Sequence, residues 1–213
     1  MTKQTIPMLK SLLEKEGAPA ESAQIVENRV IAQYQSNKLP YHNIDHIHQT
    51  LVTAQALVDT TSEPINERAL YIAIWFHDVI YNPQAHDNEE KSNDYAQNFL
   101  RKLNLAQSLT ELVATLIMDT KHHQPSTETG AIIVDADLAI LGSTPDVYSV
   151  YAAAIRQEYS WVLEEAYRHG RAQVLQKFLE RATIYNLTEA QNRWETAARR
   201  NLQQEIKALT HND

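Results

Sequence analysis

The chain has 213 residues, with 19 basic and 27 acidic side chains and no cysteine. This length predicts one sizeable domain, and the missing cysteines exclude disulfides, thiolate metal sites and cysteine nucleophiles. The net charge of −8 argues against binding to nucleic-acid polymers or anionic membranes. Residues 1–10 lack the apolar core of a signal peptide, and no apolar run approaches the ~20 residues that cross a bilayer. We therefore expect a cytoplasmic protein.

Helices dominate the predicted structure. Only four glycines occur, and the chain is rich in Ala, Leu, Glu and Gln, so we expect an all-α fold. Apolar residues recur at helical spacing in one stretch after another. In chain order these stretches are 9–17, 23–34, 46–58, 64–80, 87–103, 108–121, 132–141, 145–166, 174–182 and 188–209.

Proline, cap and glycine signals predict the helix boundaries. Pro64 is expected in a first turn, Thr144-Pro145 is typical of a cap followed by a first-turn proline, and Gly170 is expected to break a helix. Capping boxes, in which a cap residue precedes Glu or Gln by three positions, are predicted at three starts. They are Asp87/Glu90, Ser108/Glu111 and Thr188/Gln191.

Histidine and aspartate gather at a few predicted helix ends. His77-Asp78 closes the apolar run Ile74-Trp75-Phe76, and His46 lies in the first turn of the preceding helix, beside its apolar face. Asp135 and Asp137 interrupt a stretch that is otherwise apolar on nearly every side, where a carboxylate needs an explanation. Imidazole and carboxylate ligands suit a borderline or hard divalent ion, so these residues predict a metal site.

The order of His46, His77-Asp78 and Asp137 resembles the H…HD…D pattern of the HD superfamily of metal-dependent phosphohydrolases. The resemblance covers about residues 39–145, and the whole chain looks like a bacterial group of predicted HD phosphohydrolases. It implies an all-α HD-domain helical bundle with extra N- and C-terminal helices. We expect a single domain over 1–213, with the HD core at about 39–145 and flanking helices in 1–38 and 146–213.

A second resemblance is local. Tyr41-His42-Asn43-Ile44-Asp45-His46 is similar to the Y-H-N-x-x-H segment of cyclic nucleotide phosphodiesterases, and His77-Asp78-Val79 matches the H-D-V that follows in them. This similarity implies that His46 binds metal and that His42 is the general acid. The histidine that those enzymes carry four positions after the HD histidine is Tyr81 here. Val134-Asp135-Ala136-Asp137-Leu138 resembles the A-D-x-L end of HD domains, which favours Asp137 over Asp135.

The resemblance implies metal-assisted hydrolysis of a phosphoester or phosphoanhydride on a small, nucleotide-like substrate. The ligands would be His46, His77, Asp78 and Asp137, holding one or two ions of Mn, Fe, Zn, Co, Ni or Mg. If Asp78 bridges two ions, each would polarise one side of an in-line displacement, and His42 would protonate the leaving alkoxide. Alternatively, His42 closes the loop before its helix by bonding a backbone carbonyl. The partner is then a phosphorylated small molecule, not nucleic acid or membrane, and a homodimer is possible.

Other polar residues have alternative roles. His122 and His123 are either cationic caps of a helix or a further ligand or phosphate contact. Asp135 is expected to orient a ligand histidine or to start a helix, and Glu89 and Glu90 to cap a helix or, for one of them, to meet a metal-bound water. The candidate phosphate-binding side chains are basic: Lys121, Arg156, Arg171 and Arg181.

Two rival functions keep the same fold. An HD-fold di-iron oxygenase would need extra histidines between His77 and Asp137, and His86 with His122 or His123 supplies that residue type. A nucleotide-binding or regulatory module would keep the fold without turnover.

Overall fold

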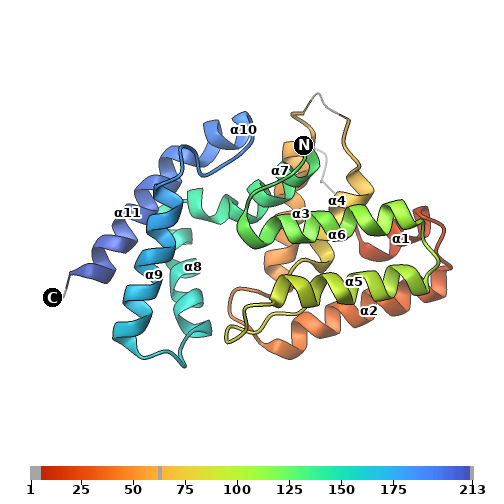
Figure 1. The fold of residues 1–213 in the computed structure, drawn as a ribbon, viewed down its shortest axis with the longest axis horizontal. Helices are drawn as coiled ribbons and strands as arrows, with labels where there is room; N and C mark the ends of the chain where they lie inside the picture. Colours follow the sequence, from red (N-terminus) through yellow and green to blue (C-terminus); the bar gives the residue numbers. More distant parts are fainter. Residues whose placement is uncertain (1–5, 62–63, 212–213) are drawn as a thin grey trace. The chain divides into compact units, whose positions relative to one another are not determined.

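The computed structural model describes residues 6–61 and 64–211. Within these ranges the chain forms helices joined by turns and loops, and it contains no strand (Figure 1). The all-α prediction is confirmed. Residue contacts divide the chain into two compact units, Met1–Ala136 and Asp137–Asp213. Two such units can be parts of one domain or two separate domains, because both sizes are within the usual range of domain sizes. The single HD-type domain over 1–213 therefore stays a prediction.

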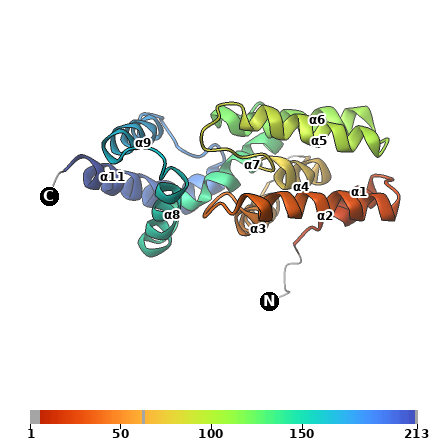
Figure 2. The same cartoon turned by 90° about the horizontal axis from the view of Figure 1, so that it is seen from below.

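The first unit is built around one buried helix. Its helices are α1 (Leu9–Lys15), α2 (Ala20–Asn37), α3 (Ile44–Val58), α4 (Glu67–Phe76), α5 (Asn88–Lys102), α6 (Gln107–His122) and α7 (Glu128–Asp137). Helix α4 contacts α1, α3, α5 and α6, and α5 and α6 run side by side (Figures 1 and 2). Because neighbours cover it on several sides, α4 is apolar around its whole circumference rather than along one stripe.

Every residue of α4 from Ala69 to Phe76 is buried. Burying one large apolar side chain contributes about 1.5–3 kcal/mol, so this helix is a main source of stability for the unit. Its polar atoms are also satisfied, because the Trp75 indole N–H donates to the Pro7 carbonyl at 2.8 Å and the Tyr34 hydroxyl donates to the Trp75 carbonyl at 3.1 Å. The end of α4 is thereby fixed in place.

The second unit is described by itself. It contains η1 (Leu138–Gly142), α8 (Pro145–Glu158), α9 (Glu164–Leu179), α10 (Thr188–Ala190), the π-helical turn η2 (Gln191–Glu195) and α11 (Thr196–Thr210). Helix α9 packs on α11, and η1 contacts α8, η2 and α11. The Arg171 guanidinium contacts the Glu205 carboxylate through two nitrogens, at 2.8 and 3.2 Å, and the Tyr148 hydroxyl donates to the same carboxylate. This network joins α8, α9 and α11.

Several predicted boundaries are wrong. Pro64 precedes α4, which starts at Glu67 after an Asn66 cap that accepts from the Ala69 N–H. Helix α6 begins at Gln107, so Ser108 lies inside it rather than at its cap. Helix α9 runs through Gly170, and the chain turns at residues 159–163 instead.

Other boundary predictions have mixed outcomes. Thr144 and Pro145 occupy the predicted cap and first-turn positions. Asp87 is at the cap position of α5, but its carboxylate pairs with Lys91. Leu187, not Thr188, occupies the cap position of α10, and the Gln191 side chain donates to the Tyr185 and Asn186 carbonyls.

No single helix in the described part of the chain is long and apolar enough to cross a bilayer. One pair of helical segments, Glu128–Gly142 and Pro145–Glu158, reaches that length and composition together, but the pair is bent by 105°.

Two helical glycines of the second unit provide a matched test of the packing. A methyl group on Gly142 would lie 2.4 Å from the Trp194 Cβ and 2.8 Å from its carbonyl oxygen, whereas one on Gly170 would meet nothing within 4 Å. We expect Gly142→Ala to destabilise the protein by about 1–3 kcal/mol through overpacking. Gly170→Ala should stabilise it by about 0.5–1 kcal/mol, because alanine favours a helix. Urea unfolding of both variants measures this, and a destabilising Gly170→Ala would contradict a continuous α9.

Candidate metal centre

The start of α3 holds His46 in place. Asn43 caps the helix, because its side-chain oxygen accepts from the Asp45 and His46 N–H groups at 2.9 and 3.3 Å. The Asn43 amide nitrogen also donates to the Leu39 and Pro40 carbonyls, both at 3.1 Å, which closes the loop before the helix. A capping asparagine of this kind fixes the helix entry. His46 is consequently buried in the first turn, with only 4 % of its surface exposed.

His77 directly follows the last residue of α4 and is buried. Its Nδ1 lies 2.8 Å from the Ile74 carbonyl oxygen. A carbonyl can only accept, so Nδ1 carries the proton and donates it. In the neutral ring Nε2 is then left with a lone pair, which is the state that a metal ligand requires, and a carbonyl partner of this type also fixes the orientation of the ring.

His46, His77 and Asp78 form a compact triangle of ligand atoms. The two Nε2 atoms are 3.4 Å apart, and Asp78 Oδ2 lies 3.5 Å from His46 Nε2 and 3.3 Å from His77 Nε2. Ligands about 2.1 Å from one ion in tetrahedral geometry are separated by about 3.4 Å. The triangle therefore has the dimensions of a divalent-metal site.

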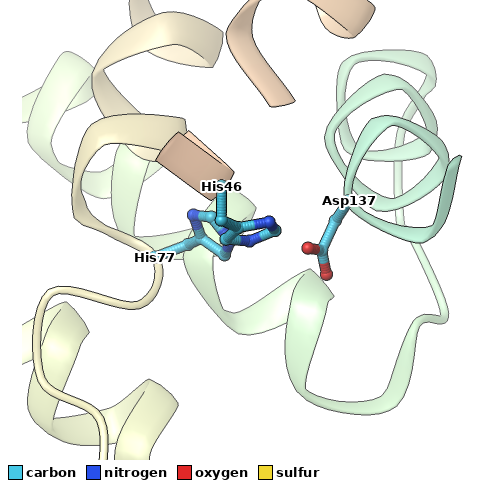
Figure 3. A group of neighbouring side chains, drawn as sticks. All are labelled: His46, His77 and Asp137. Carbon is cyan, nitrogen blue, oxygen red and sulfur yellow. The ribbon is translucent and has the colours of Figure 1, made fainter. Parts of the chain in front are cut away.

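Asp137 adds a second carboxylate. It is the last residue of α7, whose other residues belong to the first unit. One ligand atom each of His46, His77 and Asp137 lie within 4.8 Å of one another, and the Asp137 carboxylate points toward the two imidazole rings (Figure 3). Two imidazole nitrogens and two carboxylates are a fitting ligand set for Mn, Fe, Co, Ni or Zn.

His42 lies beside this group and is half-buried. Its ring stacks on the Tyr81 ring, with centroids 3.7 Å apart and planes at 15°, and its centroid is 5.9 Å from that of His46. The structure thus brings His42, His46, His77, Asp78 and Asp137 into one region. Their catalytic and metal-binding roles stay predictions.

The other acidic candidates lie near the ligands in different environments. Asp135 is fully buried in α7, two residues before Asp137. Glu89 is half-buried in the first turn of α5. Burial raises the pKa of the Glu89 carboxyl, and the negative charge of Asp78 raises it further. Asp78 is thus close enough to act electrostatically on Glu89.

The basic candidates are engaged by protein groups. Lys121 forms an ion pair with Glu90, and this pairing raises the pKa of the Lys121 ammonium and lowers that of the Glu90 carboxyl. Arg156, in the second unit, donates to the Tyr159 and Val162 carbonyls at 2.7 and 3.2 Å and pairs with Glu164. A phosphate would have to compete with these partners, and binding of phosphate by either residue stays a prediction.

Three further candidate histidines are at a helix end or outside helices. His122 is exposed at the end of α6, and His123 follows as a left-handed cap with φ 51°. His86 is exposed before α5. Among the residues that the structure describes, the group that could hold a metal ion consists of His46, His77 and Asp137 and does not include these three. The di-iron oxygenase alternative therefore gains no support from them.

Sequence reasoning missed a clamp on the turn that follows Asp78. The buried Asn88 side chain accepts from the Asn82 N–H at 2.9 Å and donates to the Asn82 carbonyl at 3.1 Å. The buried Ser92 hydroxyl accepts from the Ile80 N–H at 3.1 Å and lies 3.2 Å from the Ile80 carbonyl, to which it donates. These bonds tie the turn to the start of α5. No local pattern signals such a clamp, because each bond joins residues of different elements.

Comparisons with protein-family models, with curated proteins and with solved structures found no match. The support for the site is therefore its geometry, together with the sequence motifs.

The clamp can be tested at Ser92. Ser92→Ala removes the acceptor of the Ile80 N–H and the donor to its carbonyl. We expect a loss of about 1–3 kcal/mol in unfolding free energy, the usual cost of leaving such groups unsatisfied. Hydrogen exchange should accelerate at the Ile80 amide. Ser108→Ala, at an exposed position of α6, is the control and should change neither quantity. Unchanged exchange at Ile80 in Ser92→Ala would disprove the clamp.

Proposed function

We propose that this protein is a metal-dependent phosphohydrolase that cleaves a phosphoester or phosphoanhydride of a small, nucleotide-like molecule. The observation that carries the proposal is the triangle of His46, His77 and Asp78, with ligand atoms 3.3–3.5 Å apart. Asp137 extends the ligand set. The class of reaction and the substrate come from the resemblance of these residues to the HD pattern.

His46, His77, Asp78 and Asp137 would hold the ion. A divalent ion bound there supplies a Lewis acid that polarises the phosphoryl group and lowers the pKa of a bound water. The protein fixes its ligands beforehand: the Ile74 carbonyl sets the His77 tautomer, and the Asn43 cap sets the helical turn that carries His46. Preorganised ligands of this kind do not need to be reordered when the ion binds.

His42 is the proton donor in the proposed reaction. The attacking water gives up one proton to solvent as its oxygen bonds to phosphorus, the bond from phosphorus to the leaving oxygen breaks, and that oxygen takes a proton from the His42 imidazolium. His42 regains a proton from solvent. The His42 ring is close to the ligand group, with its centroid 5.9 Å from that of His46, and this proximity supports its role as donor to a substrate oxygen bound beside the ion.

Metal content provides the first test. We expect the purified protein, stripped by a chelator and resupplied with one divalent ion at a time, to bind Mn, Fe, Co, Ni or Zn at near-stoichiometric levels. Asp78→Ala should weaken this binding at least about tenfold, because it deletes one corner of the triangle. Asp94→Ala, at an exposed carboxylate of α5, should bind like the wild type. Equal metal binding by all three proteins would place the ion elsewhere.

Activity provides the second test, because loss of a general acid affects poor leaving groups most. We expect His42→Gln to lower kcat/KM for phenyl phosphate about 100-fold. The decrease in kcat/KM for p-nitrophenyl phosphate should be smaller, because p-nitrophenolate can leave without a proton. His48→Gln is the control, since His48 lies on the same helix and its ring packs edge-on against Trp75. Equal losses of kcat/KM on both substrates would contradict the proton-donor role of His42. If the metal-loaded wild type released no phosphate from aryl phosphates or nucleotides, the proposed function would be wrong.

A further inference from the structure

The Tyr81 ring stacks on the ring of His42. The two rings are nearly parallel, with planes at 15° and centroids 3.7 Å apart. A second ring, that of Tyr41, meets His42 edge-on, with centroids 5.0 Å apart and planes at 84°. Two aromatic rings therefore contact the imidazole, and these contacts restrict both torsions of the His42 side chain.

The backbone of Tyr81 is held on both sides. Ile80, the residue before it, is bonded at both its N–H and its carbonyl by the Ser92 hydroxyl, and Asn82, the residue after it, is bonded at both groups by the Asn88 side chain. Ser92 and Asn88 are buried in α5. The ring of Tyr81 thus projects from a segment that cannot shift without breaking bonds to these two buried side chains of α5.

We propose that Tyr81 is a positioning residue for the reaction: its ring, fixed by the clamp on Ile80 and Asn82, holds the His42 imidazole in the orientation from which it gives up its proton. The inference rests on the proposed function, in which His42 is the donor. Tyr81 itself transfers no proton in this scheme. The face of the Tyr81 ring is what contacts His42. Phenylalanine at position 81 should therefore retain the positioning effect, and an aliphatic residue should lose it.

Misalignment of a proton donor mainly reduces the stabilisation that the donor gives to the transition state. A misplacement of about 1 Å can reduce a rate by about 100-fold, because proton transfer requires close, directed contact. Loss of the stack should therefore lower the rate for a leaving group that needs the proton and spare one that does not. A ring with a merely structural role would instead lower both rates in proportion, by lowering the amount of folded enzyme.

The test combines a magnetic-resonance measurement with kinetics. The ring protons of His42, assigned by comparison with His42→Gln, should be shifted upfield by the Tyr81 ring current in the wild type and in Tyr81→Phe. They should move downfield in Tyr81→Leu. With metal-loaded enzyme, Tyr81→Leu should lower kcat for phenyl phosphate about tenfold relative to p-nitrophenyl phosphate, with KM unchanged, and Tyr81→Phe should restore the wild-type ratio.

Tyr95→Leu is the matched control, because Tyr95 is a half-buried tyrosine of the first unit whose ring packs on Phe76 and Phe99. It should leave both the His42 resonances and the ratio of rates unchanged. The inference is overturned if the His42 resonances of Tyr81→Leu match those of the wild type, or if both substrates slow equally. If the wild type hydrolyses neither substrate, the proposed function fails separately, and the resonances alone decide whether Tyr81 places the His42 ring.

Discussion

The burial of α4 is the constraint on which the candidate site depends. A helix that is apolar on all sides has to be enclosed, and α1, α3, α5 and α6 enclose it. Enclosure fixes its last turn, where the Ile74 carbonyl accepts from His77 and the Trp75 carbonyl accepts from Tyr34. Two carbonyls at the end of a helix, which lack partners within the helix, are thereby satisfied by side chains. One of those side chains is the candidate ligand itself.

Electrostatics then decides what the site can hold. Asp78 is 9 % exposed, and its Oδ2 forms a triangle with the Nε2 atoms of two buried histidines. The hydrogen bond to the Ile74 carbonyl fixes the His77 tautomer that leaves the Nε2 lone pair available to a ligand. In the proposed site, a divalent cation would bind this lone pair and compensate the carboxylate charge.

The sequence predicted part of this structure, and the reasons are local. Long apolar stripes predicted helices, but α4 ends at Phe76, directly before His77-Asp78, and not near residue 80 as the apolar spacing of Val79 and Ile80 indicated. Cap predictions at Ser108 and Thr188 were wrong, because each helix begins one or more residues earlier than the predicted cap allows: Ala106 and Leu187 are at the cap positions. Gly170 did not end α9, because α9 packs on α11 and a single glycine weakens a helix by only about 1 kcal/mol. The contact of His42 with Tyr81 joins residues 39 positions apart, and no sequence period reports such a pair.

The candidate ligands and the hydrogen bonds that support them come from different helices. The candidate ligands belong to three separate elements, the start of α3, the end of α4 and the end of α7, so a bound ion would link segments that are distant in sequence and stabilise the folded state by mass action. The supports do not need the ion. The Asn43 cap, the Ile74 carbonyl and the clamp from Asn88 and Ser92 are protein–protein hydrogen bonds. Because these bonds form on folding alone, they would hold His46 and His77 in place before an ion bound in the proposed site, and the entropy of ordering these two side chains would be lost during folding.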